Sequence, residues 1–379
     1  MSAKTERIHA LDALRAIMML LGLVLHTSAS YGEIDKLDEW GFLDPINRHL
    51  IFDVFLGLIH LFRMPIFFVV SGFFGALLFY ERSPQRMFFN RFQRIVLPFI
   101  AAMIILTPLI YLTFYFAIAR MNGVENAFIE TWNSMHFSSF FPLTTSHLWF
   151  LYYLALLTFS TGGIALLLKN QQGITSQIRA FFLKLHQNAW LKVFLLALPI
   201  FVLFHFMNAV DAYTSISIIP DWRTFVFYGI FYIYGWLLFK EKALLYDFKK
   251  QYLWFIAAGL VCFFIKAYLY LAFTPEEMFY QIVTCNALGV WFFVFGLTGL
   301  FLTFFDKASE RMRYISDASY WVYLVHLPVV ILLPGLMCGY DFSVFLKWGI
   351  TLSVTTSFCF LSYKYFVRKT FIGKFLNGK

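Results

Sequence analysis

Apolar residues along this chain form long runs that are separated by short polar segments. A helix needs about 20 predominantly apolar residues to cross the hydrocarbon core of a bilayer. Ten runs approach that length and predict membrane-spanning helices at residues 11–30, 57–79, 96–118, 148–168, 191–207, 222–239, 252–273, 282–305, 319–337 and 346–366. The run over 51–80 is too long for one straight span, so we expect part of 49–60 to form an interfacial or re-entrant helix before the second span.

The composition indicates that these runs belong to a membrane protein. Apolar residues make up 60% of the 379 residues and charged residues 13%, whereas soluble domains average about 45–50% and about 25%. The same numbers exclude disordered, collagen-like and disulfide-stabilised chains. We therefore predict an all-α fold, a polytopic integral membrane bundle of about ten transmembrane helices. It forms a single membrane-embedded domain over residues 1–379, with no separate soluble domain.

The net charge of +9 is distributed unevenly between the two sides of the predicted membrane. With the N-terminus in the cytoplasm, the cytoplasmic segments hold most of the 30 Lys and Arg residues. The opposite loops hold only Lys36, Arg48, Arg120, Arg223 and Lys347. This bias follows the positive-inside rule and places both termini in the cytoplasm. Because membrane topology accounts for the excess of basic residues, we expect no nucleic-acid partner.

The sequence offers no signature of a metal site or of a resident cofactor. The cysteines Cys262, Cys285, Cys338 and Cys359 lie in apolar runs without a CxxC or Cys/His spacing, which is typical of small buried side chains. There is no GxxxxGK(S/T), GxSxG or HExxH motif and no convincing GxGxxG. We expect no metal and no permanently bound cofactor.

Polar residues inside the first span form one stripe. A charge at the bilayer centre costs at least about 2.5–3.5 kcal/mol, so such residues are candidates for function. Asp12, Arg15, Met19, Gly22 and His26 follow steps of three and four residues and share a helical face. Arg15 and His26 are three turns apart, about 16 Å along the axis. The structural alternatives are an interfacial Asp12–Arg15 ion pair and a packing role for His26.

The second span carries a similar set. His60, Arg63 and Ser71 share a face if Pro65 does not rotate the helix much. Small residues let membrane helices approach closely, which is the structural alternative for the Ser71–Gly72 pair.

Further candidates lie near the ends of other spans. Arg91 and Arg94 are placed to hold the phosphates of an anionic cytosolic donor, with the positive-inside bias as the alternative explanation. His147, Trp149 and His326 stand beside aromatic residues. Trp149, like Tyr320 and Tyr323, is also typical of an aromatic belt at the membrane interface, whereas His326 lies well inside its span.

Together these segments resemble a known family. Arg15 with His26, FRMPIFFVVSGFF (62–74), NRFQRIVLP (90–98), SHLWFL (146–151) and SYWVYLVHLPV (319–329) are similar in sequence and order to the acyltransferase-3 membrane family. The strings at 62–74 and 146–151 resemble most its glucans biosynthesis protein C branch. That branch is described as succinylating periplasmic glucans. Other members O-acetylate surface polysaccharides. Many members end the last span with a Glu-Lys/Arg-Pro string, whereas this chain reads YFVRKTFIGKFL (365–376) there.

The resemblance implies a membrane O-acyltransferase in the bacterial inner membrane. It would move an acyl group from cytosolic acyl-CoA, as succinyl-CoA or acetyl-CoA, to hydroxyls of a periplasmic or cell-surface glycan. His26 would act as a general base or carry the acyl group, because an imidazole accepts a proton near neutral pH. Arg15 would position His26 or bind the donor, and Arg63 and Ser71 would bind the acyl carbonyl or a developing oxyanion.

The remaining candidates would bind substrates. His147, Trp149 and His326 would contact them, and Arg91 and Arg94 would hold the CoA phosphates. Two other classes stay open: a transporter or flippase of a glycan or acylated glycan, and a structural membrane scaffold. The sequence leaves the oligomeric state, the acyl group and the glycan undecided.

Overall fold

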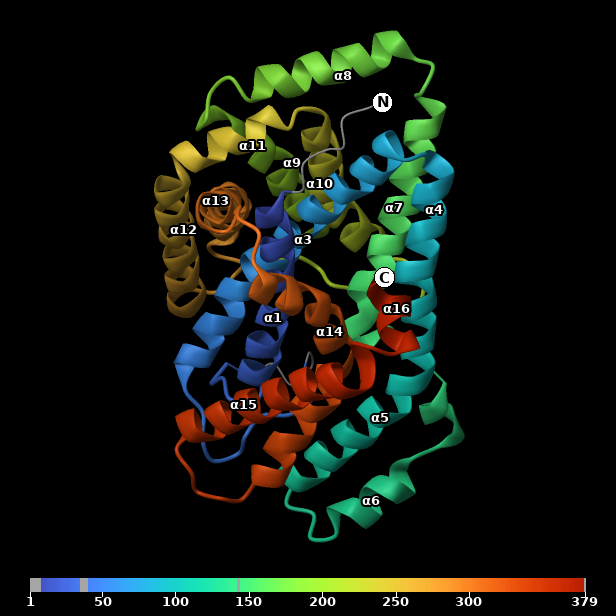
Figure 1. Ribbon diagram of the computed structural model, residues 1–379. Coiled ribbons are helices and arrows are strands. Elements are labelled where there is room, and N and C mark those ends of the chain that lie inside the picture. Colours follow the sequence, from blue (N-terminus) through green and yellow to red (C-terminus); the bar gives the residue numbers. More distant parts are fainter. Residues whose placement is uncertain (1–7, 35–39, 142–143, 378–379) are drawn as a thin grey trace.

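The fold comes from a computed structural model that describes residues 8–34, 40–141 and 144–377. In these ranges the chain forms helices and no β-strand, apart from one isolated bridge between Thr144 and Ser217. The all-α prediction is therefore confirmed. Figure 1 shows the long helices packed side by side, with the helix Gln172–Leu185 (α8) lying across one end of the bundle.

Each of the ten predicted spans lies on a helix. These helices are α1 (His9–Ala29), α3 (Leu50–Glu81), α5 (Leu97–Met121), α7 (Trp149–Leu167), α9 (Leu191–Met207), α10 (Trp222–Lys240), α12 (Tyr252–Ala272), α13 (Phe279–Phe304), α14 (Glu310–Met337) and α15 (Val344–Ser362). Shorter α-helices are α4 (Pro84–Arg91), α6 (Ala127–Ser134), α11 (Ala243–Asp247) and α16 (Phe371–Asn377). Two π-helical segments, Phe92–Val96 and Tyr363–Val367, and three 3-10 turns, Phe137–Phe140, Ser146–Leu148 and Phe248–Lys250, complete the described chain.

Within the described ranges, 8 helices are long and apolar enough to cross a membrane. The apolar helix α9 is shorter, and α10 is not one of the eight. The chain is thus a multi-pass membrane protein, whereas a total of ten spans and the cytoplasmic location of both termini stay predictions.

The interfacial or re-entrant helix expected within 49–60 is not an element of its own, because these residues belong to the helix that carries the second span, and their place relative to the membrane stays a prediction. Helix α3 runs without a break for 32 residues, from Leu50 to Glu81, with Pro65 inside it. The side chain of His49 accepts a hydrogen bond from the backbone N–H of Ile51 and begins the helix there. At 1.5 Å per residue α3 is about 48 Å long. Apolar length beyond the hydrocarbon thickness is accommodated by tilt, which the sequence pattern does not reveal.

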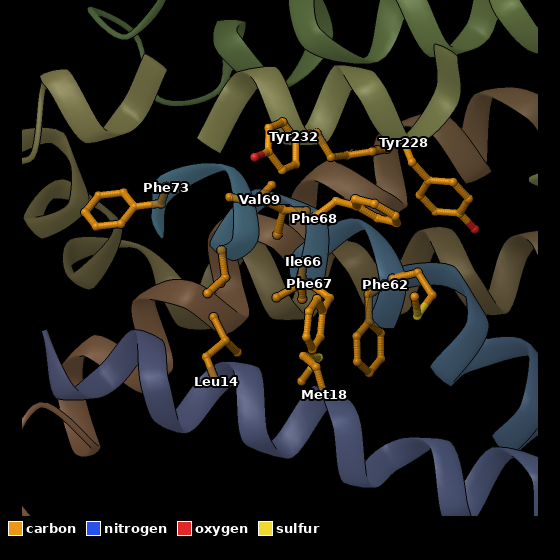
Figure 2. Close-up of a cluster of buried hydrophobic side chains, with 14 of the residues drawn as sticks. Leu14, Met18, Phe62, Ile66, Phe67, Phe68, Val69, Phe73, Tyr228 and Tyr232 are labelled. Atoms are coloured by element: carbon orange, nitrogen blue, oxygen red, sulfur yellow. The ribbon is translucent and has the colours of Figure 1, made fainter. Parts of the chain in front are cut away.

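Helix α3 lies in the core between α1 and α10 (Figure 2). A Cβ atom added at Gly72 would lie 2.0 Å from the backbone oxygen of Tyr232, and one added at Gly235 would lie 1.9 Å from that of Val69. The backbones of α3 and α10 are therefore in direct contact. Such contacts drive helix association in a bilayer, where apolar burial alone gives little preference. The interpretation of Ser71–Gly72 as a close-approach site is confirmed for Gly72.

Helix α14 packs against α1, α5 and α15. This arrangement brings the second half of the chain against the first span, and it positions the polar residues of both helices. On α15, Lys347 lies in the first helical turn rather than in a loop, and it forms a fully buried ion pair of 2.8 Å with Asp44.

Candidate functional site

Three histidines from distant parts of the chain come together. We call His26 of α1, His147 of the turn Ser146–Leu148 and His326 of α14 the histidine cluster. The ring of His326 lies between the other two, with centroid distances of 5.3 Å to His26 and 5.4 Å to His147. The sequence predicted each histidine as a site residue, and the packing of α14 against α1 joins them.

His326 is fixed in one tautomer by its own helix. Its side chain is buried, and Nδ1 lies 3.1 Å from the backbone oxygen of Val322 and 2.7 Å from that of Tyr323. Because carbonyl oxygens only accept hydrogen bonds, Nδ1 carries the proton. Nε2 is then the basic nitrogen, and it is buried without a hydrogen-bond partner.

His147 shows the reverse tautomer. Its Nε2 lies 3.1 Å from the backbone oxygen of Leu324, so Nε2 donates and the buried Nδ1 keeps a lone pair without a partner. The hydroxyl of Tyr323 donates to the backbone oxygen of His147 at 2.7 Å. Ser146, just before it, has a φ of 45°, in the left-handed region that few non-glycine residues adopt. The turn that presents His147 is thus held by α14 against local backbone preference.

The ring of His26 contacts the indole of Trp40 and the imidazole of His326. Its ring stacks on Trp40 with a centroid distance of 5.4 Å and an interplanar angle of 19°. The indole N–H of Trp40 donates to the Ser30 hydroxyl at 3.0 Å. The His26 ring is half-buried, and its Nδ1 is buried without a hydrogen-bond partner. One face of this imidazole is therefore covered by Trp40, from the connection between α1 and α3.

The buried guanidinium of Arg63 lies against α1 at Gly22, one helical turn before His26. Arg63 of α3 donates from Nε to the backbone oxygen of Met18 at 3.0 Å. Its guanidinium covers Gly22, where an added Cβ atom would lie 2.8 Å from Nη2. The charge of Arg63 acts on all three rings of the histidine cluster. Gly22 therefore leaves the space on the polar stripe of α1 that this guanidinium fills.

Arg15 and His26 face the same neighbour, as their spacing predicts. Nη2 of Arg15 donates to the hydroxyl of Ser316 on α14 at 3.4 Å, while His26 meets His326 further along that helix. Arg15 also lies 3.6 Å from Asp12, so the predicted ion pair exists alongside the shared stripe.

Arg91 and Arg94 lie at the Arg15 end of α1. Arg91 ends α4, and Arg94 belongs to the π-helical segment Phe92–Val96. The backbone oxygen of Arg94 accepts a hydrogen bond from Tyr320 of α14 at 3.0 Å, and Nε of Arg91 is buried without a partner. The charge of Arg15 acts on both. We call Arg15, Arg91 and Arg94 the arginine cluster.

The amino-acid sequence over most of the chain matches a known protein family. Residues 8–364 match the family profile described as an acyltransferase domain, the acyltransferase-3 family. The chain belongs to this family. It is similar to the proteins named glucans biosynthesis protein C from Salmonella paratyphi A and Salmonella agona, each 27% identical over 372 residues that cover 90% of both chains. No solved structure matches it. The resemblance seen in the sequence is confirmed.

Two other predicted site residues have no described contact with the rings of the histidine cluster. Trp149 packs its ring against Tyr228 of α10 at a centroid distance of 5.2 Å. Ser71 is buried on α3, and among the described residues no hydrogen bond joins it to the cluster. On α3 it is therefore Arg63, rather than Ser71, that has a described contact with the polar stripe of α1.

Sequence reasoning missed Trp40 and misjudged Tyr323. Tyr323 is almost fully buried and holds His147, so it is not a residue of an interfacial belt. Its position three residues before His326, on the same helix, is the only signal that the sequence offered. Trp40 lies in a connection that carries no periodic pattern, and nothing in the sequence relates it to His26.

The histidine cluster does not form a metal site. In the ranges that the structure describes, no three side chains among His, Cys, Asp and Glu are placed to hold a metal ion. The three rings instead pack at centroid distances of 5.3 and 5.4 Å, with two of their nitrogens bonded to backbone oxygens.

Proposed function

We propose that this protein is a membrane O-acyltransferase of the bacterial inner membrane. It moves a succinyl or acetyl group from cytosolic acyl-CoA to a hydroxyl of a periplasmic or cell-surface glycan. Membership of the acyltransferase family supports the reaction, and relatives named for glucan biosynthesis support the acceptor class. The single observation that carries the proposal is a cluster of three imidazoles, each with one buried nitrogen that has no hydrogen-bond partner, beside the buried guanidinium of Arg63.

Acyl transfer to a hydroxyl requires a base and stabilisation of a developing oxyanion. In the proposed reaction His26 takes the hydroxyl proton while the hydroxyl oxygen forms a bond to the thioester carbon. The carbon–sulfur bond then breaks, the proton passes to the leaving thiolate, and an ester and free CoA result. His326 and His147 surround His26 as neutral imidazoles with fixed tautomers, and they contact the substrate.

Arg63 binds the acyl carbonyl as negative charge develops on its oxygen. A guanidinium at a buried position stabilises such charge strongly, because little water competes with it. When the donor is succinyl-CoA, the free carboxylate of the acyl group is a second anion that a planar guanidinium binds through two hydrogen bonds.

The arginine cluster binds the donor through its phosphates. Arg15 lies about 16 Å along α1 from His26, since eleven residues of helix separate them. An extended pantetheine arm spans about 15 Å, at the 1.1–1.2 Å per bond of an extended chain. A pyrophosphate held at the arginine cluster therefore places the thioester at the depth of the histidine cluster.

The decisive test is the O-acyl content of glycans made by a deletion strain that carries His26→Ala. Mass spectrometry is expected to show loss of the acyl groups that the wild-type gene restores. His205→Ala is the matched control, because His205 lies on the apolar helix α9 with an exposed side chain. Wild-type acylation by a folded His26→Ala protein would remove His26 from the mechanism.

Capture of the acyl group by His26 is a second route within the same function. In that route the imidazole displaces CoA first, and the glycan hydroxyl then attacks the acyl-imidazole. Incubation with radiolabelled acyl-CoA in the absence of glycan distinguishes the two, since only the second leaves label on the protein. A transporter or flippase would neither bind acyl-CoA nor release free CoA.

A further inference from the structure

A cleft of about 470 Å³ lies where the beginning of α14 meets the C-terminal segment. Four cationic side chains and two carboxylates line it: Arg313, Arg368, Lys369, Lys374, Glu310 and Asp317. We call it the C-terminal cleft. Its volume falls within the range of about 300–1,000 Å³ that small-molecule sites occupy.

Two tyrosines give the C-terminal cleft an aromatic wall. The rings of Tyr314 and Tyr363 meet edge to face at a centroid distance of 5.6 Å. The guanidinium carbon of Arg368 lies 5.1 Å from the ring centroid of Tyr314. Aromatic and guanidinium planes stack on nucleobases, and the cationic side chains attract phosphate. The carboxylates Glu310 and Asp317 accept hydrogen bonds from amino or hydroxyl groups.

Helix α14 connects this cleft with the arginine cluster. Arg313 lines the cleft, and Ser316, three residues later, accepts the hydrogen bond from Arg15. Tyr320, one turn further, donates to the backbone oxygen of Arg94. Helix α16 lies against both α14 and the segment Phe92–Val96. Along α14, the C-terminal cleft therefore lies beside the arginine cluster, at the end of the helix away from His326.

We propose that the C-terminal cleft binds the adenosine 3′-phosphate end of the CoA donor. The inference rests on the proposed function, in which acyl-CoA supplies the acyl group. CoA carries a pyrophosphate and, beyond the ribose, a 3′-phosphate. The three polar sites along α14 then divide the donor: the thioester lies at the histidine cluster, the pyrophosphate at the arginine cluster, and the adenosine 3′-phosphate in the C-terminal cleft.

The other source of phosphate at this place is an anionic phospholipid headgroup. Lipid headgroups and CoA share the phosphate chemistry, but only CoA has a 3′-phosphate that can be removed without changing the rest of the molecule. The test is therefore the dissociation constant of CoA and of 3′-dephospho-CoA, measured on the full chain in phosphatidylcholine nanodiscs with and without phosphatidylglycerol.

The variant for this test is Arg368→Gln/Lys369→Gln. Its matched control is Lys307→Gln/Lys364→Gln, which removes the same charge from exposed side chains that do not line the cleft. The wild type and the control are expected to bind CoA at least about tenfold more tightly than 3′-dephospho-CoA, because charge-assisted contacts to one phosphate are lost. The cleft variant is expected to bind both ligands equally, with unchanged affinity for 3′-dephospho-CoA.

Three results would overturn the inference. One is wild-type affinity of the cleft variant for CoA. Another is an equal loss of affinity for CoA and for 3′-dephospho-CoA in that variant. The third is a wild type that binds CoA and 3′-dephospho-CoA equally. If the first result comes with less phosphatidylglycerol retained by the cleft variant in native mass spectrometry, the cleft is a lipid site. If the wild type binds neither CoA nor 3′-dephospho-CoA, the proposed function itself fails, and this outcome is distinct from the other three.

Discussion

The imidazoles of His26 and His326 face each other at a centroid distance of 5.3 Å, from helices at opposite ends of the chain. The two rings are held differently. His326 is fixed through Nδ1 by carbonyl oxygens of its own helix, whereas His26 is stacked against Trp40. Their unpartnered nitrogens, Nε2 of His326 and Nδ1 of His26, lie in the same buried environment. The basic nitrogen of His326 is thus held in a fixed orientation beside the ring of His26.

The tautomer of His326 makes a specific substitution informative. In His326→Asn the side-chain amide still donates to the backbone oxygens of Val322 and Tyr323, but the basic nitrogen is gone. We expect a folded protein whose acyl transfer is about 10-fold to 100-fold slower, because the substrate hydroxyl loses the acceptor that orients it towards His26. The measurement is the release of free CoA by purified protein with glycan present.

The corresponding control for that result is His205→Asn on α9, which should retain wild-type activity. A His326→Asn protein with full activity would show that the basic nitrogen of His326 takes no part in the reaction.

Gly22 offers a way to displace Arg63 without removing it. A Cβ atom in Gly22→Ala would lie 2.8 Å from a terminal nitrogen of Arg63, so the guanidinium has to move. Because a flexible side chain can shift, we expect little change in thermal stability. A misplaced catalytic contact lowers activity about 10-fold to 100-fold. Gly163→Ala, where no atom lies within 4 Å, is the control. Equal activity of the two variants would mean that the position of Arg63 does not matter.

The buried pair between Asp44 and Lys347 should dominate stability at its end of the bundle. Both side chains are 0% exposed and 2.8 Å apart. Lys347→Met leaves a buried carboxylate without its cation, and we expect it to lower the free energy of unfolding by about 3–5 kcal/mol. In Asp44→Asn/Lys347→Met no charge is left, so much of this loss should be recovered.

Thermal unfolding of these two variants in nanodiscs measures the difference. A double variant that is less stable than Lys347→Met would contradict this explanation, and it would assign the stability to the hydrogen bonds that Asp44 accepts from the backbone of Ile46 and Asn47.

His186 should make the docking of α8 sensitive to acid. Burial lowers the pKa of His186 from 6.5 to about 4, and nearby Lys192 lowers it further while Asp247 opposes the change. Its ring bridges the backbone oxygen of Phe182 and the hydroxyl of Tyr234. The fold therefore favours the neutral ring, whose stabilisation is complete above pH 6.5 and is lost as the pH falls towards 4.

Thermal unfolding midpoints at pH 7 and at pH 5 test whether acid lowers the stability. The wild type is expected to lose more stability between these two values than His186→Gln, which has no titrating group at this position. A larger loss in the variant would contradict the prediction.

Which segments are helices could be predicted from the amino-acid sequence. An apolar run of membrane length is a local property, so each predicted span coincides with a helix from α1 to α15. The spacing of Arg15 and His26 likewise placed both on one face, because helical periodicity relates neighbours along one chain segment. The family resemblance followed from short strings that are also local. The sequence did not show that α3 is one helix, since the hydrophobic pattern does not encode tilt.

The neighbours that those helix faces contact could not be predicted and follow from the packing of the helices. His147 and His326 join His26 because α14 packs against α1 and holds the turn before α7. The tautomers, the stacking of Trp40 and the C-terminal cleft depend on contacts between residues far apart along the chain. In a bilayer, apolar side chains are equally stable against lipid or protein, so close-packed glycines and a few polar contacts select the partners of each helix. Those contacts belong to pairs of helices and are not written in either helix alone.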